Sequence, residues 1–215
     1  MVPKGTALPG ASVFVPPATT LGELRAAAQQ CEGCDLYRNA TQAVFGEGPP
    51  GAPVLLVGEQ PGDKEDLAGR PFVGPAGALL NRALDDAGLE RSDVFITNAV
   101  KHFKFEERGK RRIHKKPSTS ETVACRPWLK AEIAIVRPRF IVCLGATAAH
   151  SLLGPGHRLS EQRGRFFPHL WADGVTATIH PSAILRSSYS AQRELDYKAF
   201  VNDLILVRKK LKESS

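Results

Sequence analysis

The chain has 215 residues, 42% of them hydrophobic, which is enough to bury one substantial core but short for two full-sized domains. No segment approaches the roughly 18 consecutive apolar residues of a membrane helix, and residues 1–17 lack the pattern of a secretory signal, so we expect a cytosolic protein without a membrane partner. The formal net charge of +7 indicates an anionic partner.

Residues 1–18 are rich in Pro, Gly and Ala without periodicity, and we expect them to form a flexible arm. Thr20 followed three positions later by Glu23 is the signature of a helix capping box, and apolar residues continue from there at helical spacing. The Cys-x-x-Cys motif formed by Cys31 and Cys34 therefore follows the end of a helix.

Four short apolar runs have the composition of strands that are buried on both faces. They are residues 53–58 (PVLLVG), 93–100 (DVFITNAV), 139–145 (RFIVCLG) and a run ending near His180 (VTATIH). Apolar residues at helical spacing, glycine stop signals and a proline suited to a first turn predict further helices. These cover residues 79–87, residues 127–136, a short segment before Gly154, and residues 200–211.

Strands that alternate with helices require crossover connections and hence a mainly parallel sheet. We therefore predict that residues 19–215 form one α/β domain, with three layers (α/β/α) around a central, mainly parallel sheet of four strands. Ligands of such sheets bind beyond the carboxyl ends of the strands, and Glu59, Gln60, Asn98 and His180 follow three of the predicted strands. These polar residues are expected to form one site. No phosphate-binding glycine fingerprint follows the first strand, which argues against a dinucleotide or P-loop site.

The positive charge is concentrated at residues 105–117, which we expect to be a basic loop inserted into the domain. Six positive charges fall within nine residues: Arg108, Lys110, Arg111, Arg112, Lys115 and Lys116. A nucleic-acid backbone is the leading candidate for their partner, and a solvated, mobile loop is the alternative. His114 lies within this run. A neutral imidazole is a competent nucleophile, and positive neighbours should lower the pKa of His114 because they disfavour the imidazolium. DNA phosphates would oppose this shift, so the sequence does not decide the net pKa of His114.

The four cysteines are too few for a disulfide scaffold, and a reducing compartment favours a metal site instead. Seventeen residues separate the last two, Cys125 and Cys143. Four thiolates accept either a tetrahedral zinc ion or a cubane iron–sulfur cluster. Cys143 lies in an apolar strand, so simple core packing is the alternative for this residue.

Several spaced motifs together resemble the uracil-DNA glycosylases that carry an iron–sulfur cluster. They are GEQPGDKEDLAGRPFVGPAG (58–77), TNAVKHF (97–103), HPSAILR (180–186) and the cysteine set. Gln60, where the hydrolytic members usually have alanine, and the KRRIH insertion resemble the UdgX subgroup in particular. The likeness covers about residues 31–200. It implies a uracil-DNA-glycosylase fold, excision of uracil from DNA and, for this subgroup, a covalent bond between the protein and the excised site. It also implies a [4Fe-4S] cluster with the ligands Cys31, Cys34, Cys125 and Cys143.

Uracil excision requires that the base be flipped out of the stack and read in a pocket. The amide of Asn98 offers an acceptor and donors that match uracil N3–H and O4, and Phe72 offers a stacking face. Without the resemblance, Asn98 is more typical of a cap at the turn after a strand, and Phe72 of an aromatic residue in the core. Gly58 and Gln60 are assigned to the uracil pocket with them.

Cleavage of the N-glycosidic bond develops positive charge on the sugar and negative charge on uracil, so both charges need stabilisation. His180 is expected to donate to uracil O2, and Glu59 to face the sugar cation or to orient the attacking group. Gln60 is grouped with these catalytic residues. His114 is expected to bond to C1′ of the sugar where water would otherwise attack.

The HPSAILR segment is expected to present a loop to the DNA, with Leu185 or Arg186 filling the gap left by the flipped base; a helix start capped by Ser182 is the alternative. The expected DNA-binding residues are Lys101, Lys110, Arg111, Arg112, Ser182, Leu185 and Arg186. Affinity should then fall steeply with salt.

Three functions remain open from the sequence. The first is a self-crosslinking uracil-DNA glycosylase that acts on single-stranded DNA. The second is a hydrolytic, turnover glycosylase whose basic loop only grips DNA, and the third is a non-enzymatic, metal-stabilised nucleic-acid-binding module. In each case we expect a monomer in a bacterial cytoplasm, associated with the nucleoid through DNA.

Overall fold

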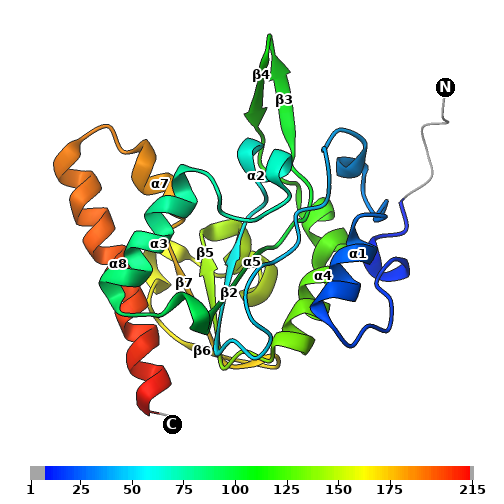
Figure 1. Ribbon diagram of the computed structural model, residues 1–215. Helices are drawn as coiled ribbons and strands as arrows, with labels where there is room; N and C mark the ends of the chain where they lie inside the picture. Colours follow the sequence, from blue (N-terminus) through cyan, green and yellow to red (C-terminus); the bar gives the residue numbers. More distant parts are fainter. Residues whose placement is uncertain (1–7, 214–215) are drawn as a thin grey trace.

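The computed structural model describes residues 8–213, which fold around a sheet of five strands in the order β2-β1-β5-β7-β6 (Figure 1). The strands are β1 (Val54–Gly58), β2 (Val94–Asn98), β5 (Phe140–Leu144), β6 (Phe167–His169) and β7 (Ala172–Thr178). The first three and β7 are parallel, and β6 pairs antiparallel with β7 at the edge. The predicted, mainly parallel α/β fold is confirmed. The count of four strands was wrong, because β6 has three residues, none of them buried, and so carries no strand periodicity.

Helices cover both faces of the sheet: α3 and α8 lie on one side of it in Figure 1, and α4 with α1 on the other. The helices are α1 (Leu21–Ala28), α2 (Asp63–Ala68), α3 (Pro75–Ala87), α4 (Thr119–Val136), α5 (Ala146–Leu153), α6 (Leu159–Gln162), α7 (Pro181–Arg186) and α8 (Ser190–Glu213). Three 3-10 turns complete the set: Ala11–Val13, Asp35–Arg38 and Arg91–Asp93. Within residues 8–213, no helix is both long and apolar enough to cross a membrane.

The helix boundaries follow local capping more closely than apolar spacing. The capping box of Thr20 and Glu23 starts α1 as predicted. A second capping box, made by Ser118 and Glu121, starts α4 well before the predicted start at Pro127, which lies inside the helix. The HPSAILR segment forms α7 rather than a loop, and its N-cap is His180 rather than Ser182.

The residues before α1 pack on the domain instead of forming a loose arm. Residues 1–7 of the expected arm lie outside the described residues. Ala11 is buried, and the Gly10 N–H donates to the Gly33 carbonyl at 3.1 Å. The contact requires a glycine at position 33, because a Cβ there would lie 2.6 Å from the Ala11 nitrogen. The expectation of a flexible arm was therefore wrong for residues 8–18.

The basic insertion is an antiparallel hairpin of β3 (Phe105–Arg108) and β4 (Arg111–His114), not a loop. It projects from the end of the sheet at which β2 and β5 terminate (Figure 1). Gly109 has a φ of 59°, a left-handed conformation suited to glycine at a tight turn. Phe105 pairs with His114, so the register places His114 at the foot of the hairpin, next to the domain.

Candidate functional site

A cavity of about 730 Å³ opens at the carboxyl ends of the parallel strands. The structure brings together there most of the polar and aromatic residues that the sequence grouped: Glu59, Gln60, Phe72, Asn98, His114 and His180. It also adds residues from the end of β5 and the start of α5, among them Thr147. This edge of the sheet is therefore one composite site.

Asn98 ends β2 and lies beside Gly58, the last residue of β1. Its side chain is 2% exposed, and its Oδ1 has no hydrogen-bond partner among the described residues. A buried acceptor without a partner is rare in folded proteins, so Oδ1 is available to a donor on a ligand. At Gly58 a Cβ would lie 2.3 Å from this oxygen and 2.8 Å from Cζ of Phe72, so only glycine keeps this space open.

Phe72 has a φ of 55°, a conformation that costs energy for a residue with a side chain. Gly77 allows the backbone to adopt it, since a Cβ at position 77 would fall 1.6 Å from the Phe72 carbonyl oxygen. The Phe72 ring stacks with His180 at 5.8 Å between centroids and 26° between planes. The two rings together form an aromatic wall of the cavity.

His180 is held as a neutral hydrogen-bond donor. Its Nδ1 accepts from the Ser182 backbone N–H at 3.1 Å, so the single proton of the neutral ring lies on Nε2. Burial, with the charges of Arg186 and His114, lowers the pKa of His180 to about 4. At neutral pH the ring therefore presents an N–H without carrying a positive charge.

His114 lies beside Glu59, with 3.4 Å between its Nε2 and Glu59 Oε1. The other carboxylate oxygen, Oε2, accepts a hydrogen bond from the Thr147 hydroxyl. The pKa of His114 is lowered mainly by burial and further by Arg186, while Glu59 opposes the shift. The flanking cations of the hairpin, which were expected to lower this pKa, are not the cause of the shift. With its side chain 49% exposed, the ring remains accessible to a partner.

Gln60 lines the cavity, but its amide is engaged by the hairpin. Its Nε2 donates to the carbonyls of Lys104 at 3.1 Å and Lys115 at 3.0 Å, and its Oε1 accepts from the Lys104 N–H at 3.1 Å. These contacts clamp both strands of the hairpin at the base. Gln60 thus holds the base of the hairpin that carries His114, and its expected catalytic and uracil-binding role stays a prediction.

Arg112 joins the hairpin to α2. Its guanidinium bonds Asp63 Oδ1 and Asp66 Oδ2, each at 2.6 Å, and Asp66 is fully buried. It also lies over the rings of Phe103 and Phe105, at 5.5 and 5.0 Å from the centroids. The guanidinium of Arg112 is therefore already paired with two carboxylates inside the protein, and its expected contact with DNA stays a prediction.

Lys101 is also not on the surface. Its side chain is 1% exposed, and its Nζ lies 2.7 Å from Glu132 Oε2, from Thr97 Oγ1 and from the Asn98 carbonyl oxygen. A buried charge requires such a set of partners. The expected DNA contact of Lys101 is thus excluded, and the residue instead supports the main chain at Asn98.

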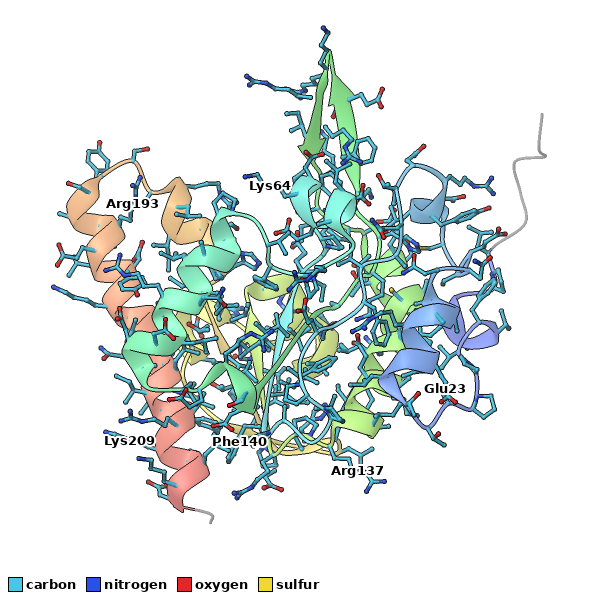
Figure 2. All side chains as sticks on the ribbon, in the orientation of Figure 1. Glu23, Lys64, Arg137, Phe140, Arg193 and Lys209 are labelled. Atoms are coloured by element: carbon cyan, nitrogen blue, oxygen red, sulfur yellow. The ribbon has the colours of Figure 1, made fainter. Side chains whose placement is uncertain are left out.

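The remaining expected DNA-binding residues differ in their availability. Lys110 and Arg111 are exposed at the hairpin tip, and Leu185 and Arg186 are exposed on α7. Ser182 is engaged inside the protein, where its hydroxyl accepts from Arg186 at 3.1 Å and lies 2.8 Å from His180 Nδ1. In Figure 2 side chains project from both edges of the hairpin, and the labelled Lys64 and Arg193 lie on the same side of the molecule.

Three of the four cysteines gather in one region. Cys31 and Cys125 are buried in the same core cluster, which Cys34 contacts. The pKa of Cys125 is raised to about 12, chiefly by burial and also by the charges of the other two thiols. Two N–H groups donate to this set: Trp128 Nε1 to Cys31 Sγ at 3.1 Å, and the Lys101 backbone to Cys125 Sγ at 3.3 Å.

Cys143 does not join them. It lies in β5 within a different core cluster, and burial alone raises its pKa. The expected four-cysteine ligand set is therefore not brought together, and core packing accounts for Cys143. Within the described residues, no group of three or more His, Cys, Asp or Glu side chains is arranged to hold a metal ion.

Comparison with known proteins matches residues 45–205 to the model of the Uracil DNA glycosylase superfamily. A Type-4 uracil-DNA glycosylase of Thermotoga maritima is 40% identical over 169 residues, which cover 78% of this chain and 84% of the relative. The corresponding protein of Pyrobaculum aerophilum is 38% identical over 173 residues, covering 77% and 85%. That of Archaeoglobus fulgidus is 36% identical over 176 residues, covering 78% and 85%.

Proposed function

This chain belongs to the uracil-DNA glycosylase superfamily, and we propose that it excises uracil from DNA and captures the resulting sugar covalently through His114. The observation that carries the proposal is the 3.4 Å contact of His114 Nε2 with Glu59 Oε1 at the cavity that also contains Asn98, Phe72 and His180. An imidazole held beside a carboxylate at a base pocket has the arrangement of an activated nucleophile.

The pocket chemistry suits uracil. The unpaired Asn98 Oδ1 accepts from N3–H, a donor that cytosine lacks at that position, and the amide nitrogen is left to face O4. The Phe72 ring supplies the stacking face. As the C1′–N1 bond breaks, negative charge grows on uracil O2, and the Nε2–H of neutral His180 is suited to stabilise it.

The covalent step conserves atoms and charge. Glu59 accepts the Nε2 proton of His114, and the freed lone pair forms a bond to C1′ as the C1′–N1 electron pair leaves with uracil. The proton on Glu59 then passes to the uracil anion. The products are neutral uracil and a sugar bonded to an imidazole nitrogen, and no water is consumed.

The hairpin holds the nucleophile at the cavity. Gln60 clamps its base, and Arg112 ties it to α2 through Asp63 and Asp66. Together with the KRRIH insertion, this clamp supports assignment to a UdgX-like subgroup. A hydrolytic glycosylase would instead need the ring withdrawn so that water reaches C1′.

We propose that the gathered cysteines hold the [4Fe-4S] cluster implied by the sequence resemblance. Cys31, Cys34 and Cys125 fit thiolate ligands, since two N–H groups already donate to their sulfur atoms. Cys143 does not fit, so the fourth ligand is another group. When bound, the cluster would cross-link the segment before β1 to α4, and it supplies no step of the excision.

The preferred substrate is single-stranded DNA bound by a monomer in a bacterial cytoplasm. Lys110, Arg111 and Arg186 are exposed on the side where the cavity opens and are suited to phosphates. Each phosphate neutralised on a single strand contributes about 0.7 to the slope of log affinity against log salt.

The test is to incubate the protein with a uracil-containing single-stranded oligonucleotide and to separate the products on a denaturing gel. We expect one adduct per protein from the wild type, and free abasic product without adduct from His114→Ser. Lys110→Ala, a change at the hairpin tip, is the control: it should weaken DNA binding, but with excess protein it should still form the adduct. An undiminished adduct from His114→Ser would overturn the role of His114. Many abasic sites per wild-type protein would identify a turnover enzyme. If neither adduct nor abasic product forms, the protein is a nucleic-acid-binding module without this activity.

A further inference from the structure

Thr147 is a buried hydroxyl residue at the cavity that the chemistry above does not use. It lies in the first turn of α5, directly after Gly145 caps the helix at the end of β5. Its Oγ1 donates to Glu59 Oε2, the carboxylate oxygen that does not face His114. The two oxygens of Glu59 are thus divided between a hydroxyl on one side and an imidazole on the other.

This division matters because a glutamate side chain has several rotatable bonds, and the last of them has only a broad preference. A carboxylate anchored at one oxygen keeps the other in a defined direction. Thr147 is a suitable anchor, since its branched side chain is stiff and its helix begins at a strand end of the sheet.

We propose that Thr147 is a positioning residue whose hydroxyl holds Glu59 with Oε1 directed at His114 Nε2. The inference rests on the proposed function and adds a third member to its nucleophile pair. Thr147 donates a hydrogen bond and keeps its own proton throughout. The proton of His114 passes to Glu59, so the balance of the covalent step is unchanged. In this role Thr147 acts through Glu59 rather than on the base or the sugar.

The experiment compares Thr147→Val, which keeps the shape but lacks the hydroxyl, with Thr147→Ser, which keeps the hydroxyl. Excess protein is mixed with uracil-containing single-stranded DNA, and the rate of adduct formation is measured in a single turnover. We expect Thr147→Val to slow the adduct about tenfold, since a hydrogen bond to a charged group is lost. Thr147→Ser should stay near the wild-type rate. DNA affinity and the melting temperature should remain within error for both.

A double-mutant cycle separates positioning from a general structural effect. In a Glu59→Gln background the carboxylate base is already absent, so Thr147→Val should cause little further loss. Ser151→Ala is the matched control, because Ser151 is a buried hydroxyl on the same helix that donates to the Ala148 carbonyl and does not line the cavity. It should form the adduct at the wild-type rate. If Thr147→Val does not fold, Thr147→Ala is used with the same expectation.

Two results would overturn the inference alone: a wild-type rate for Thr147→Val, or an equal loss from that change with and without the Glu59 carboxylate. A wild-type protein that forms no adduct would overturn the proposed function, and the positioning role of Thr147 with it. The wild-type lane of the same gel distinguishes these cases.

Discussion

Replacing Gln60 with alanine should uncouple uracil excision from covalent capture. The change removes three hydrogen bonds at the base of the hairpin, two donated by Nε2 and one accepted by Oε1. It leaves Asn98, Phe72 and His180 in place, because the hydrogen bonds of the Gln60 amide to described residues go to Lys104 and Lys115. The base pocket therefore survives while the support of His114 weakens.

The size of the effect follows from these bonds. At about 0.5–1.5 kcal/mol each, their sum of about 1.5–4.5 kcal/mol is an upper bound on the lost support. The hairpin also keeps the bond from the Lys115 N–H to the Lys104 carbonyl and the ion pairs of Arg112. We therefore take about 2 kcal/mol, which lowers the rate of adduct formation by up to about thirtyfold.

The assay is the single-turnover gel with uracil-containing single-stranded DNA, scored for adduct and for free abasic product. Gln60→Ala should lose adduct and gain abasic product. Gln60→Glu should behave similarly, since a carboxylate cannot donate to the carbonyls of Lys104 and Lys115. Lys110→Ala controls for the charge of the hairpin. Adduct formation by Gln60→Ala at the wild-type rate, without abasic product, would refute the clamp.

Four further predictions concern lysine, histidine and cysteine side chains. Lys101→Met should lower the free energy of unfolding in urea by about 3–5 kcal/mol, because it leaves a carboxylate buried without its partner; a change only in the salt dependence of DNA binding would contradict this. The rate of adduct formation should stay constant as the pH falls just below 6.5, the ordinary pKa of histidine, because the pKa of His114 is lowered and the ring is still neutral there. A pH–rate profile in which the rate already declines at pH 6.5 or above would argue against this. Stability should fall as the pH drops from 6.5 to about 4, since His180 takes up a proton in the unfolded state before it does in the folded state, so the unfolded state binds more protons; urea midpoints across this range that do not change would oppose it. The Cys143→Ala protein should keep its iron and sulfide content on purification, whereas the Cys125→Ser protein should lose it. Loss of iron from Cys143→Ala would instead support Cys143 as the fourth cluster ligand.

The strands of the sheet were predictable because each buried strand is a continuous apolar run with a polar residue at its carboxyl end. That pattern also located the site, since Glu59, Asn98 and His180 follow such runs. The edge strand β6 and the short helix α2 do not form such continuous apolar runs. Their formation depends on pairing with β7 and on the bonds of Asp63 and Asp66 to Arg112, which are contacts between distant segments.

The roles of charged and thiol side chains could not be assigned in the same way. Lys101 and Arg112 have the composition of a DNA-binding surface, yet each is paired with carboxylates brought from elsewhere in the chain. Cys143 has a ligand-like spacing from Cys125, but the strand that carries it runs through a different part of the core. Nothing in the sequence marked Thr147 as a site residue except its position shortly after the end of a strand.

The amino-acid sequence by itself determined the fold class, the position of the site at the strand ends and the side chains that could carry its chemistry, because these depend on local apolar runs and on residue type. Only the tertiary structure decided which charges face solvent, which thiols meet, and that Gln60 bonds the base of the hairpin while Thr147 bonds Glu59. Those properties arise from partners tens of residues away, and the energy of a charge or a hydrogen bond depends on what surrounds it.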